Sequence, residues 1–336
     1  MSCRVLLLVI FVTYVAQVSA QRNDFATINF QRADSVAAAY ADHSLLDREL
    51  LSEKLTRDLN TDVEKFRVIY TWVSQNIRYD YATYQKNQVQ RKKLKGQEEL
   101  KAWNQKIRVT VFKNLIHHKK TVCTGYAYLV KELSDYAGLE CEIIDGYGRN
   151  VVSNLRGPAI ANHQWNTVRL NGKWYLADAT WSSGSYNLTE HAFNKHYDDG
   201  YFLAEPAVFV RNHYPLDTAW LLLPRKLTLD DFIRRPLVYR GIYRYGVQEI
   251  VPGTFDFVTS PDTSISFGFT GSSSVKIEKA TLEIEHGSKK EIVPISVARK
   301  EDGMYYVDYK FKSRGRRAVH ILANDDHLIS FSVDVR

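Results

Sequence analysis

The sequence predicts an α+β core with helices on its N-terminal side, followed by an all-β sandwich. Within residues 34–77 and again at 123–137, apolar residues recur every three or four positions, which is the period of helices with one buried face. Between about 139 and 178 the apolar pattern alternates, as in strands. From about 245 to the end, short β-prone runs alternate with turn residues, which is typical of a separate sandwich.

The helical part opens with residues 34–59, which contain an apolar set of leucines. Thr61 or Asp62 can cap the next helix, because both side chains accept hydrogen bonds from free backbone N–H groups. Apolar residues within 111–116 predict a short helix, and a strongly periodic helix is expected over 123–137.

Three strands are expected after these helices, at 139–145, 163–170 and 173–178. The last two flank Asn171-Gly172, and Asn-Gly is the strongest short signal for a two-residue type I′ hairpin. An aromatic-rich connection follows over roughly 185–240. Six strands of the sandwich are expected at 264–269, 280–285, 291–297, 305–311, 317–322 and 328–335.

The first twenty residues have the pattern of a secretory signal peptide. Arg4 precedes an apolar stretch from Val5 to Val15, and Ser19 and Ala20 are small, as a signal peptidase requires. The stretch is shorter than the roughly 20 residues of a membrane span, although an uncleaved anchor stays an alternative. We therefore expect a secreted protein, extracellular or periplasmic, without a stable membrane span.

Four segments follow from these patterns: a signal peptide at 1–20, an N-terminal helical segment at 21–60, a core at 61–240 and a β-sandwich at 245–336. The overall composition, 45% hydrophobic and 25% charged, is that of a globular protein. It excludes a disordered chain and an integral membrane protein.

Removal of the signal peptide leaves two cysteines, Cys123 and Cys141. In an exported protein two cysteines usually form a disulfide. Here a helix over 123–137 separates its two ends by about 20 Å, and a disulfide requires Cα atoms within about 7 Å. We therefore expect Cys141 to be a small buried residue and Cys123 to be free.

The net charge of +7 is concentrated in one stretch. Residues 81–120 hold eleven Lys and Arg against Glu98 and Glu99, a local charge of +9 (11 − 2). Either residues 86–120 bind an acidic partner, or the stretch is a solvated, partly helical insertion. No nucleic-acid-binding module is recognisable, which favours the insertion and argues against a specific nucleic-acid partner.

Cys123, His163 and Asp178 are the candidate catalytic residues. In a two-residue hairpin at Asn171-Gly172, paired residue numbers sum to 343, so Trp165 faces Asp178. His163 and Asp178 are then diagonal neighbours on one face, with Cβ atoms under about 8 Å apart. A slip of one residue would place them on opposite faces, so the expectation is sharp.

These three residue types suit nucleophilic acyl transfer. At a helix N-terminus the dipole and free amides stabilise the thiolate of Cys123, and its N–H can serve as one oxyanion-hole donor. His163 would transfer the proton, and Asp178 would orient it and stabilise its charged form. Taken singly, each residue has a structural explanation as a packing, surface or capping residue; the joint geometry favours catalysis.

The remaining histidines show no Cys or carboxylate partner at metal-binding spacing. We interpret them as structural or surface residues and expect no metal and no cofactor. No acidic cluster requires a calcium site either. The histidines concerned are His117, His118, His191, His196 and His213.

Several ordered blocks of the sequence resemble the transglutaminase-like superfamily, the papain-related thiol acyl-transfer enzymes, and in particular the kyphoscoliosis peptidase branch. The resemblance spans roughly residues 45–240. The blocks are Glu64-Lys65, Ile69-Tyr70-Thr71-Trp72-Val73, Asn76-Ile77-Arg78-Tyr79-Asp80, Val122-Cys123-Thr124-Gly125-Tyr126-Ala127, Ala137-Gly138-Leu139, the segments around His163 and Asp178-Ala179-Thr180-Trp181, Tyr201-Phe202-Leu203, Pro206, His213-Tyr214-Pro215, Asp217 and Trp220.

The resemblance implies a transglutaminase-like core with a Cys-His-Asp triad, carried onto Cys123, His163 and Asp178. It also implies an immunoglobulin-like character for the C-terminal sandwich. Two departures stand out: Gln164 replaces the Ala that usually follows the histidine, and the basic stretch of about 82–107 is longer than usual.

Two classes of function compete. One is an exported cysteine enzyme that acts on protein or peptide amides, as a peptidase, a deamidase or a transglutaminase. The other is a catalytically retired scaffold or adhesion protein that binds partners through its sandwich and basic segment. The intact triad favours the enzyme, and the acceptor of the acyl group, water or an amine, is not encoded in any motif.

Overall fold

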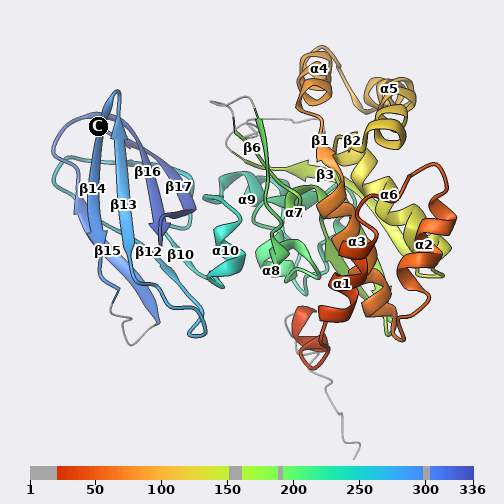
Figure 1. Cartoon of the computed structure of the whole chain (residues 1–336). Helices are drawn as coiled ribbons and strands as arrows, with labels where there is room; N and C mark the ends of the chain where they lie inside the picture. Colours follow the sequence, from red (N-terminus) through yellow and green to blue (C-terminus); the bar gives the residue numbers. More distant parts are fainter. Residues whose placement is uncertain (1–20, 151–160, 188–191, 298–302) are drawn as a thin grey trace, which may run out of the picture.

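The computed structural model describes residues 21–150, 161–187, 192–297 and 303–336. The expected signal peptide at 1–20 lies outside the described residues. Figure 1 shows two parts side by side, a mixed core of helices and strands and a C-terminal part built of strands, with α10 (Gly241–Arg244) between them. Within the described part, no helix combines the length and apolar character needed to cross a membrane.

The N-terminal segment folds into short helices rather than one continuous helix. Residues 34–59 are divided between α1 and α2, because the Asp47 side chain accepts a hydrogen bond from Leu50 N and begins a new helix. Thr61 caps α3, and Glu64 completes the capping box. The elements are η1 (Gln21–Phe25), α1 (Gln31–Ala39), α2 (Arg48–Thr56) and α3 (Asp62–Asn76).

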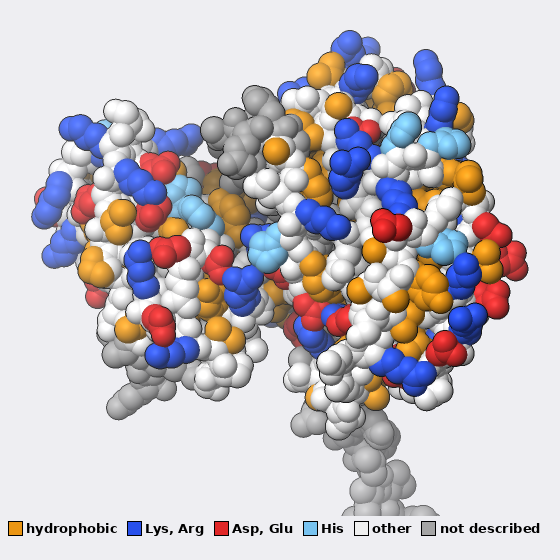
Figure 2. All heavy atoms as spheres, in the orientation of Figure 1, with side chains coloured by type: hydrophobic (Ala, Val, Ile, Leu, Met, Phe, Trp, Pro, Cys, Tyr) orange, Lys and Arg blue, Asp and Glu red, His pale blue; other side chains and the backbone are white. Residues whose placement is uncertain are grey.

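The basic stretch forms two helices, α4 (Tyr81–Arg91) and α5 (Gln97–His118). They lie between β1 (Arg78–Tyr79) and β2 (Lys120–Thr121), which pair in parallel. The sequence predicted only a short helix at 111–116, because most of α5 is exposed and shows no continuous apolar face. Lys and Arg side chains gather over α4 and α5 on the face shown in Figure 2.

A four-stranded antiparallel sheet forms the centre of the core, in the order β5-β4-β3-β8. Asn171 and Gly172 have φ angles of 49° and 80°, as a type I′ turn requires. Leu170 pairs with Lys173 and Asn166 with Ala177, so the predicted register is confirmed. The strands are β3 (Cys141–Gly148), β4 (His163–Leu170), β5 (Lys173–Ala177) and β8 (His213–Pro215).

Helix α6 (Cys123–Tyr136) packs on one face of this sheet. Leu129 and Leu133 of α6 share a buried cluster with Val168 of β4, and Cys141 is 1% exposed in the same cluster. Cys141 is thus the small buried residue that the sequence predicted. The opposite face is covered too, since Trp165 packs with Phe209 and other residues that follow the hairpin.

Short elements connect the hairpin to the C-terminal strands, as the irregular pattern of 185–240 predicted. They include β9, which pairs with β17 of the C-terminal part. The elements are α7 (Ala179–Ser182), β6 (Gly184–Asn187), β7 (Ala192–Lys195), η2 (Asp199–Tyr201), α8 (Pro206–Phe209), η3 (Thr218–Leu221), α9 (Leu229–Arg234), β9 (Leu237–Val238) and α10.

The C-terminal part contains two sheets, β10-β12-β15 and β11-β17-β16-β13-β14 with β9 beside β17. Phe267 and Phe269 of the first sheet share a buried core with Leu282 and Phe331 of the second. All six predicted strands are present, and an immunoglobulin-like character stays a prediction. The strands are β10 (Ile250–Val251), β11 (Asp256–Thr259), β12 (Ser264–Thr270), β13 (Ala280–His286), β14 (Lys289–Ile295), β15 (Met304–Lys310), β16 (Gly315–Ala323) and β17 (Asp326–Val335).

Gly146 allows β3 to approach β8 closely. A Cβ atom there would lie 2.3 Å from the backbone oxygen of Tyr214 and 2.4 Å from the Trp165 ring. We predict that Gly146→Ala lowers the free energy of unfolding by about 2–3 kcal/mol, because overpacking forces the strands apart. Urea denaturation measures this, with Gly253→Ala as control, since no atom lies within 4 Å there. Equal midpoints for the two variants would contradict the prediction.

Candidate active site

Cys123 is the first residue of α6 and is partly exposed. Val122 precedes it and provides no side-chain cap. The first backbone N–H groups of α6 are therefore not occupied by a capping side chain at the end of the helix that carries the thiol. Gly125 lets this end approach the neighbouring strand, since a Cβ there would lie 2.0 Å from the Thr121 hydroxyl. The helix dipole at this position favours a thiolate, as the sequence predicted.

His163 and Asp178 meet through a direct hydrogen bond. Nε2 of His163 donates to Oδ2 of Asp178 at 2.7 Å, and both side chains are buried. The Cys123 thiol lies close enough to the His163 ring for the two groups to shift each other's pKa through hydrogen bonding and charge. The structure therefore brings together the three site residues that the sequence predicted, in the spatial order Cys123, His163, Asp178.

Asp178 ends the hairpin and begins α7, so it is held by backbone as well as side chains. Its Oδ1 accepts hydrogen bonds from the N–H groups of Thr180 at 2.8 Å and Trp181 at 3.2 Å. Burial alone would raise the pKa of Asp178, but the charge and hydrogen bond of His163, with help from His213, hold it well below its usual range. The carboxylate is therefore ionised throughout the physiological range.

The ionised carboxylate determines the charge of the other two groups. Burial alone would lower the pKa of His163, but the charge and hydrogen bond of Asp178, together with the bond to Cys123, raise it to about 10. Burial alone would raise the pKa of Cys123, but the hydrogen bond and charge of His163 lower it. The geometry thus favours the thiolate form of Cys123 beside a charged His163.

His213 is a functional neighbour that the sequence reading missed, because we interpreted it as structural or surface. Its Nε2 lies 2.9 Å from Oδ2 of Asp178, and its ring stacks on Phe209 with centroids 3.9 Å apart. Burial lowers the pKa of His213 to about 4 even beside Asp178, and the nearby charge of His163 adds to this. His213 is therefore a neutral donor to the carboxylate, since one carboxylate cannot neutralise two buried imidazolium ions.

The potential ligand atoms of His163, Asp178 and His213 lie within 4.8 Å of one another, a grouping that could suit a metal ion. The spacing of these atoms favours hydrogen bonds instead. Each Nε2 lies 2.7 or 2.9 Å from the same carboxylate oxygen. A zinc ion with bonds of about 2.0–2.1 Å would hold its tetrahedral ligands roughly 3.3 Å apart. These residues do not fit a metal as they are arranged.

Arg91 connects the basic stretch to the site, which gives one member of that stretch a specific position. Its guanidinium donates to the backbone oxygen of Ala161 at 2.7 Å, two residues before His163. Its positive charge also contributes to the lowered pKa of Cys123. The charge count of the sequence pointed to this stretch, but no pattern distinguished Arg91 from the other basic residues.

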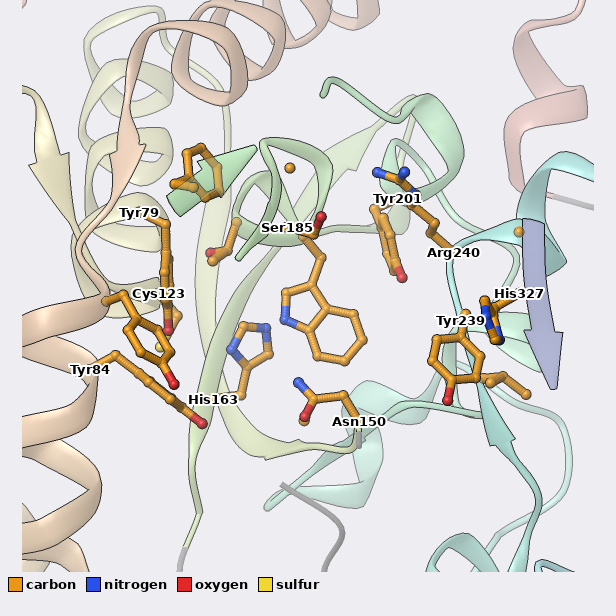
Figure 3. Close-up of a pocket in the computed structure, with 18 of the residues that line it drawn as sticks. Tyr79, Tyr84, Cys123, Asn150, His163, Ser185, Tyr201, Tyr239, Arg240 and His327 are labelled. Atoms are coloured by element: carbon orange, nitrogen blue, oxygen red, sulfur yellow. The ribbon is translucent and has the colours of Figure 1, made fainter. Parts of the chain in front are cut away.

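A cavity of about 540 Å³ opens over Cys123 and His163. Figure 3 shows Tyr79, Tyr84 and Cys123 on one side of it and Tyr239, Arg240 and His327 on the other. The first group comes from β1, α4 and α6 of the core. The second comes from the segment before α10 and from β17, so both parts of the chain line the cavity.

The geometry agrees with the comparison with known families. Residues 49–179 match the family model described as the transglutaminase-like superfamily. The chain therefore carries a domain of the transglutaminase-like superfamily, and Cys123 and His163 lie within the matched range, as does Asp178.

Sequence similarity to three curated proteins is more specific than the family match. Kyphoscoliosis peptidase of Homo sapiens is 29% identical over 252 residues, which cover 74% of this chain and 34% of the relative. Kyphoscoliosis peptidase of Mus musculus is 29% identical over 228 residues, covering 67% and 31%. Hillarin of Drosophila melanogaster is 26% identical over 252 residues, covering 70% and 28%. The chain spans about a third of the length of these curated relatives.

Solved structures show a weaker likeness. A crystal structure of a TGase has a TM-score of 0.28 and 14% identity, covering 56% of this chain and 40% of that one. A putative protease from Parabacteroides distasonis has a TM-score of 0.28 and 11% identity, covering 89% and 53%. TM-scores this low carry no argument about the fold.

The negative charge of Asp178 predicts at which pH the Cys123 thiol becomes reactive. In Asp178→Asn the pKa of His163 falls, because its anionic partner is lost, and Cys123 loses the adjacent cation. We expect the midpoint of Cys123 alkylation by iodoacetamide to rise by at least about one pH unit. Stopped alkylation across pH 4–10 with mass spectrometry measures it. Asp135→Asn, at the exposed end of α6, is the control and should keep the wild-type midpoint.

The hydrogen bond from His213 to Asp178 predicts that His213 positions the carboxylate, beyond any contribution from the packing of its ring. His213→Phe keeps a ring but removes the donor to Asp178, whereas His213→Gln keeps an amide donor. We expect the Phe variant to alkylate Cys123 roughly tenfold more slowly at pH 6.5, because a hydrogen bond to a charged group contributes about 1.5–3 kcal/mol, and the Gln variant to recover part of the rate. Lower thermal stability in both variants with unchanged thiol reactivity would reduce His213 to a packing role.

Proposed function

We propose that the chain is an exported, cysteine-dependent acyl-transfer enzyme that acts on amide bonds of proteins or peptides. The observation that carries the proposal is the hydrogen-bonded pair of His163 and Asp178 beside the Cys123 thiol, with Cys123 and His163 lining an open cavity. A low thiol pKa beside a charged imidazole is the arrangement that a nucleophilic cysteine requires.

In the proposed reaction, the Cys123 thiolate attacks the carbonyl carbon of the amide and forms a tetrahedral intermediate. His163 then gives its proton to the leaving amine, and the C–N bond breaks to leave a thioester on Cys123. Asp178 holds the His163 ring in place and stabilises its charged form until the proton leaves. An acceptor, water or an amine, next loses a proton to His163 and releases the acyl group.

The acceptor decides the class of the enzyme. Water would make it a peptidase or a deamidase, and a lysine amine would make it a transglutaminase. The partial exposure of Cys123 leaves room for either acceptor. The names of the relatives include a peptidase, which favours hydrolysis for this chain as well.

Export and the acidic partner belong to the same proposal as expectations from the sequence. The pattern of residues 1–20 favours secretion. For the acidic partner, which the sequence favours less than a solvated insertion, the Lys and Arg side chains over α4 and α5 would supply the positive charge. Arg91 of the same segment reaches the site, so such a partner would bind near the cavity.

The proposal predicts an activity that depends on one of two cysteines. Wild type and Cys141→Ser should both process a casein-like protein in the presence of a labelled amine, because Cys141 is buried away from the cavity. Cys123→Ser should lose at least about 10³-fold, as expected for removal of a nucleophile. Gel electrophoresis scores cleavage, and amine fluorescence scores transamidation.

The alternative of a retired scaffold makes the opposite prediction in this assay. If neither cleavage, deamidation nor amine incorporation exceeds that of Cys123→Ser, the enzymatic proposal is wrong. Equal partner binding by wild type and Cys123→Ala would then identify the protein as a scaffold.

A further inference from the structure

Gln21 makes an unusual set of contacts for a residue at the start of the described chain. Its side chain is 3% exposed and lies against β5, which is the edge strand of the core sheet. Its Nε2 donates to the backbone oxygen of Trp174 at 2.9 Å, and its Oε1 accepts from the N–H of Leu176 at 3.0 Å. The amide therefore satisfies two backbone groups that an edge strand leaves open, as a neighbouring strand would.

The backbone nitrogen of Gln21 points at a carboxylate. It donates to Oε2 of Glu205 at 3.1 Å, directly before α8. Burial raises the pKa of Glu205, and Lys173 and Asp24, which face it with opposite charges, pair with each other at 2.6 Å. Among the residues that the structure describes, Glu205 makes no ion pair. A half-buried carboxylate thus faces a neutral amide where a cation would suit it better.

The same residue follows the small residues at which the sequence predicts cleavage. Ser19 and Ala20 precede Gln21, and Ala20–Gln21 is the bond that a signal peptidase would cut. Hydrolysis of this bond adds one water, leaves a carboxylate on Ala20 and converts the Gln21 amide nitrogen into an α-amine. This amine takes up a proton near neutral pH, since its ordinary pKa is about 8.

We propose that hydrolysis of Ala20–Gln21 creates an α-ammonium group on Gln21 that forms an ion pair with Glu205 and anchors the mature N-terminus to β5. The inference rests on the proposed export of the chain and is independent of the catalytic residues. Cleavage replaces one N–H donor by a charged group with three, at a position already 3.1 Å from the carboxylate oxygen. Maturation therefore strengthens the contact without any rearrangement of the fold.

The anchoring also controls the chemistry of the new terminus. A free N-terminal glutamine cyclises when its amine attacks its own side-chain amide carbon and expels ammonia. In this fold the amide is held by Trp174 and Leu176, and the amine by Glu205. Cyclisation would break both the Nε2 donor bond and the ion pair. The folded, mature protein therefore keeps an open glutamine at its N-terminus.

The test uses the full chain, expressed in a secreting host and purified from the medium or periplasm. Intact-mass measurement and N-terminal sequencing identify the first residue. An amine-reactive ester at pH 7 then labels α-amines in preference to lysines, whose pKa is about 10.4. The variants are Glu205→Gln and, as matched control, Glu140→Gln, which removes an exposed carboxylate paired with Arg169. Thermal unfolding reports that each variant is folded.

We expect an unmodified Gln21 at the N-terminus and α-amine labelling that is at least about tenfold slower in wild type and Glu140→Gln than in Glu205→Gln, corresponding to about 1.4 kcal/mol. In denaturant the three proteins should label at one rate. A protein that retains residues 1–20 would overturn both the proposed export and this inference. A start at another residue, a terminus lighter by one ammonia, or equal labelling of the folded proteins would overturn the inference alone.

Discussion

The carboxylate of Asp178 is the constraint on which the proposed site depends. Four hydrogen bonds converge on its two oxygens, two from the α7 backbone and one each from His163 and His213. The backbone bonds fix the carboxylate, and the carboxylate in turn keeps one imidazole charged and leaves the other neutral. The acidity of the Cys123 thiol is thus set by a group that does not touch it. The hairpin, α6 and β8 all supply parts of this one arrangement.

The sequence predicted those parts of the site that are encoded locally. Asn171-Gly172 determines the turn type, the turn determines the register, and the register places His163 beside Asp178. His213 escaped prediction because it reaches Asp178 through β8, a strand of three residues that pairs with β3 far back in the chain. No periodic pattern marks so short a strand.

The length of α5 escaped prediction for a different reason, since an exposed helix carries little apolar periodicity. Arg91 could not be recognised because its role comes from one contact with Ala161, across 70 residues of sequence. The cavity shows the same limit on a larger scale. Core residues such as Tyr79 and C-terminal residues such as Tyr239 line it from opposite sides, so its shape depends on how the two parts of the chain pack.

The solitary position of Cys123 has a consequence for the lifetime of the protein. A thiol with a lowered pKa is readily oxidised to a sulfenic acid, and many redox proteins recover from this state through a second, resolving cysteine. Cys141 cannot serve, because it is buried in the core, where its Sγ lies 3.8 Å from Nδ2 of Asn166, and it does not line the cavity over Cys123. Outside the reducing cytosol, a sulfenic acid on Cys123 therefore has to be reduced by small-molecule thiols. Otherwise it is oxidised further, to sulfinic and sulfonic acids that are not reduced back to the thiol. The lowered thiol pKa that would make Cys123 an effective nucleophile therefore also makes its sulfur the atom whose oxidation limits the lifetime of the active protein.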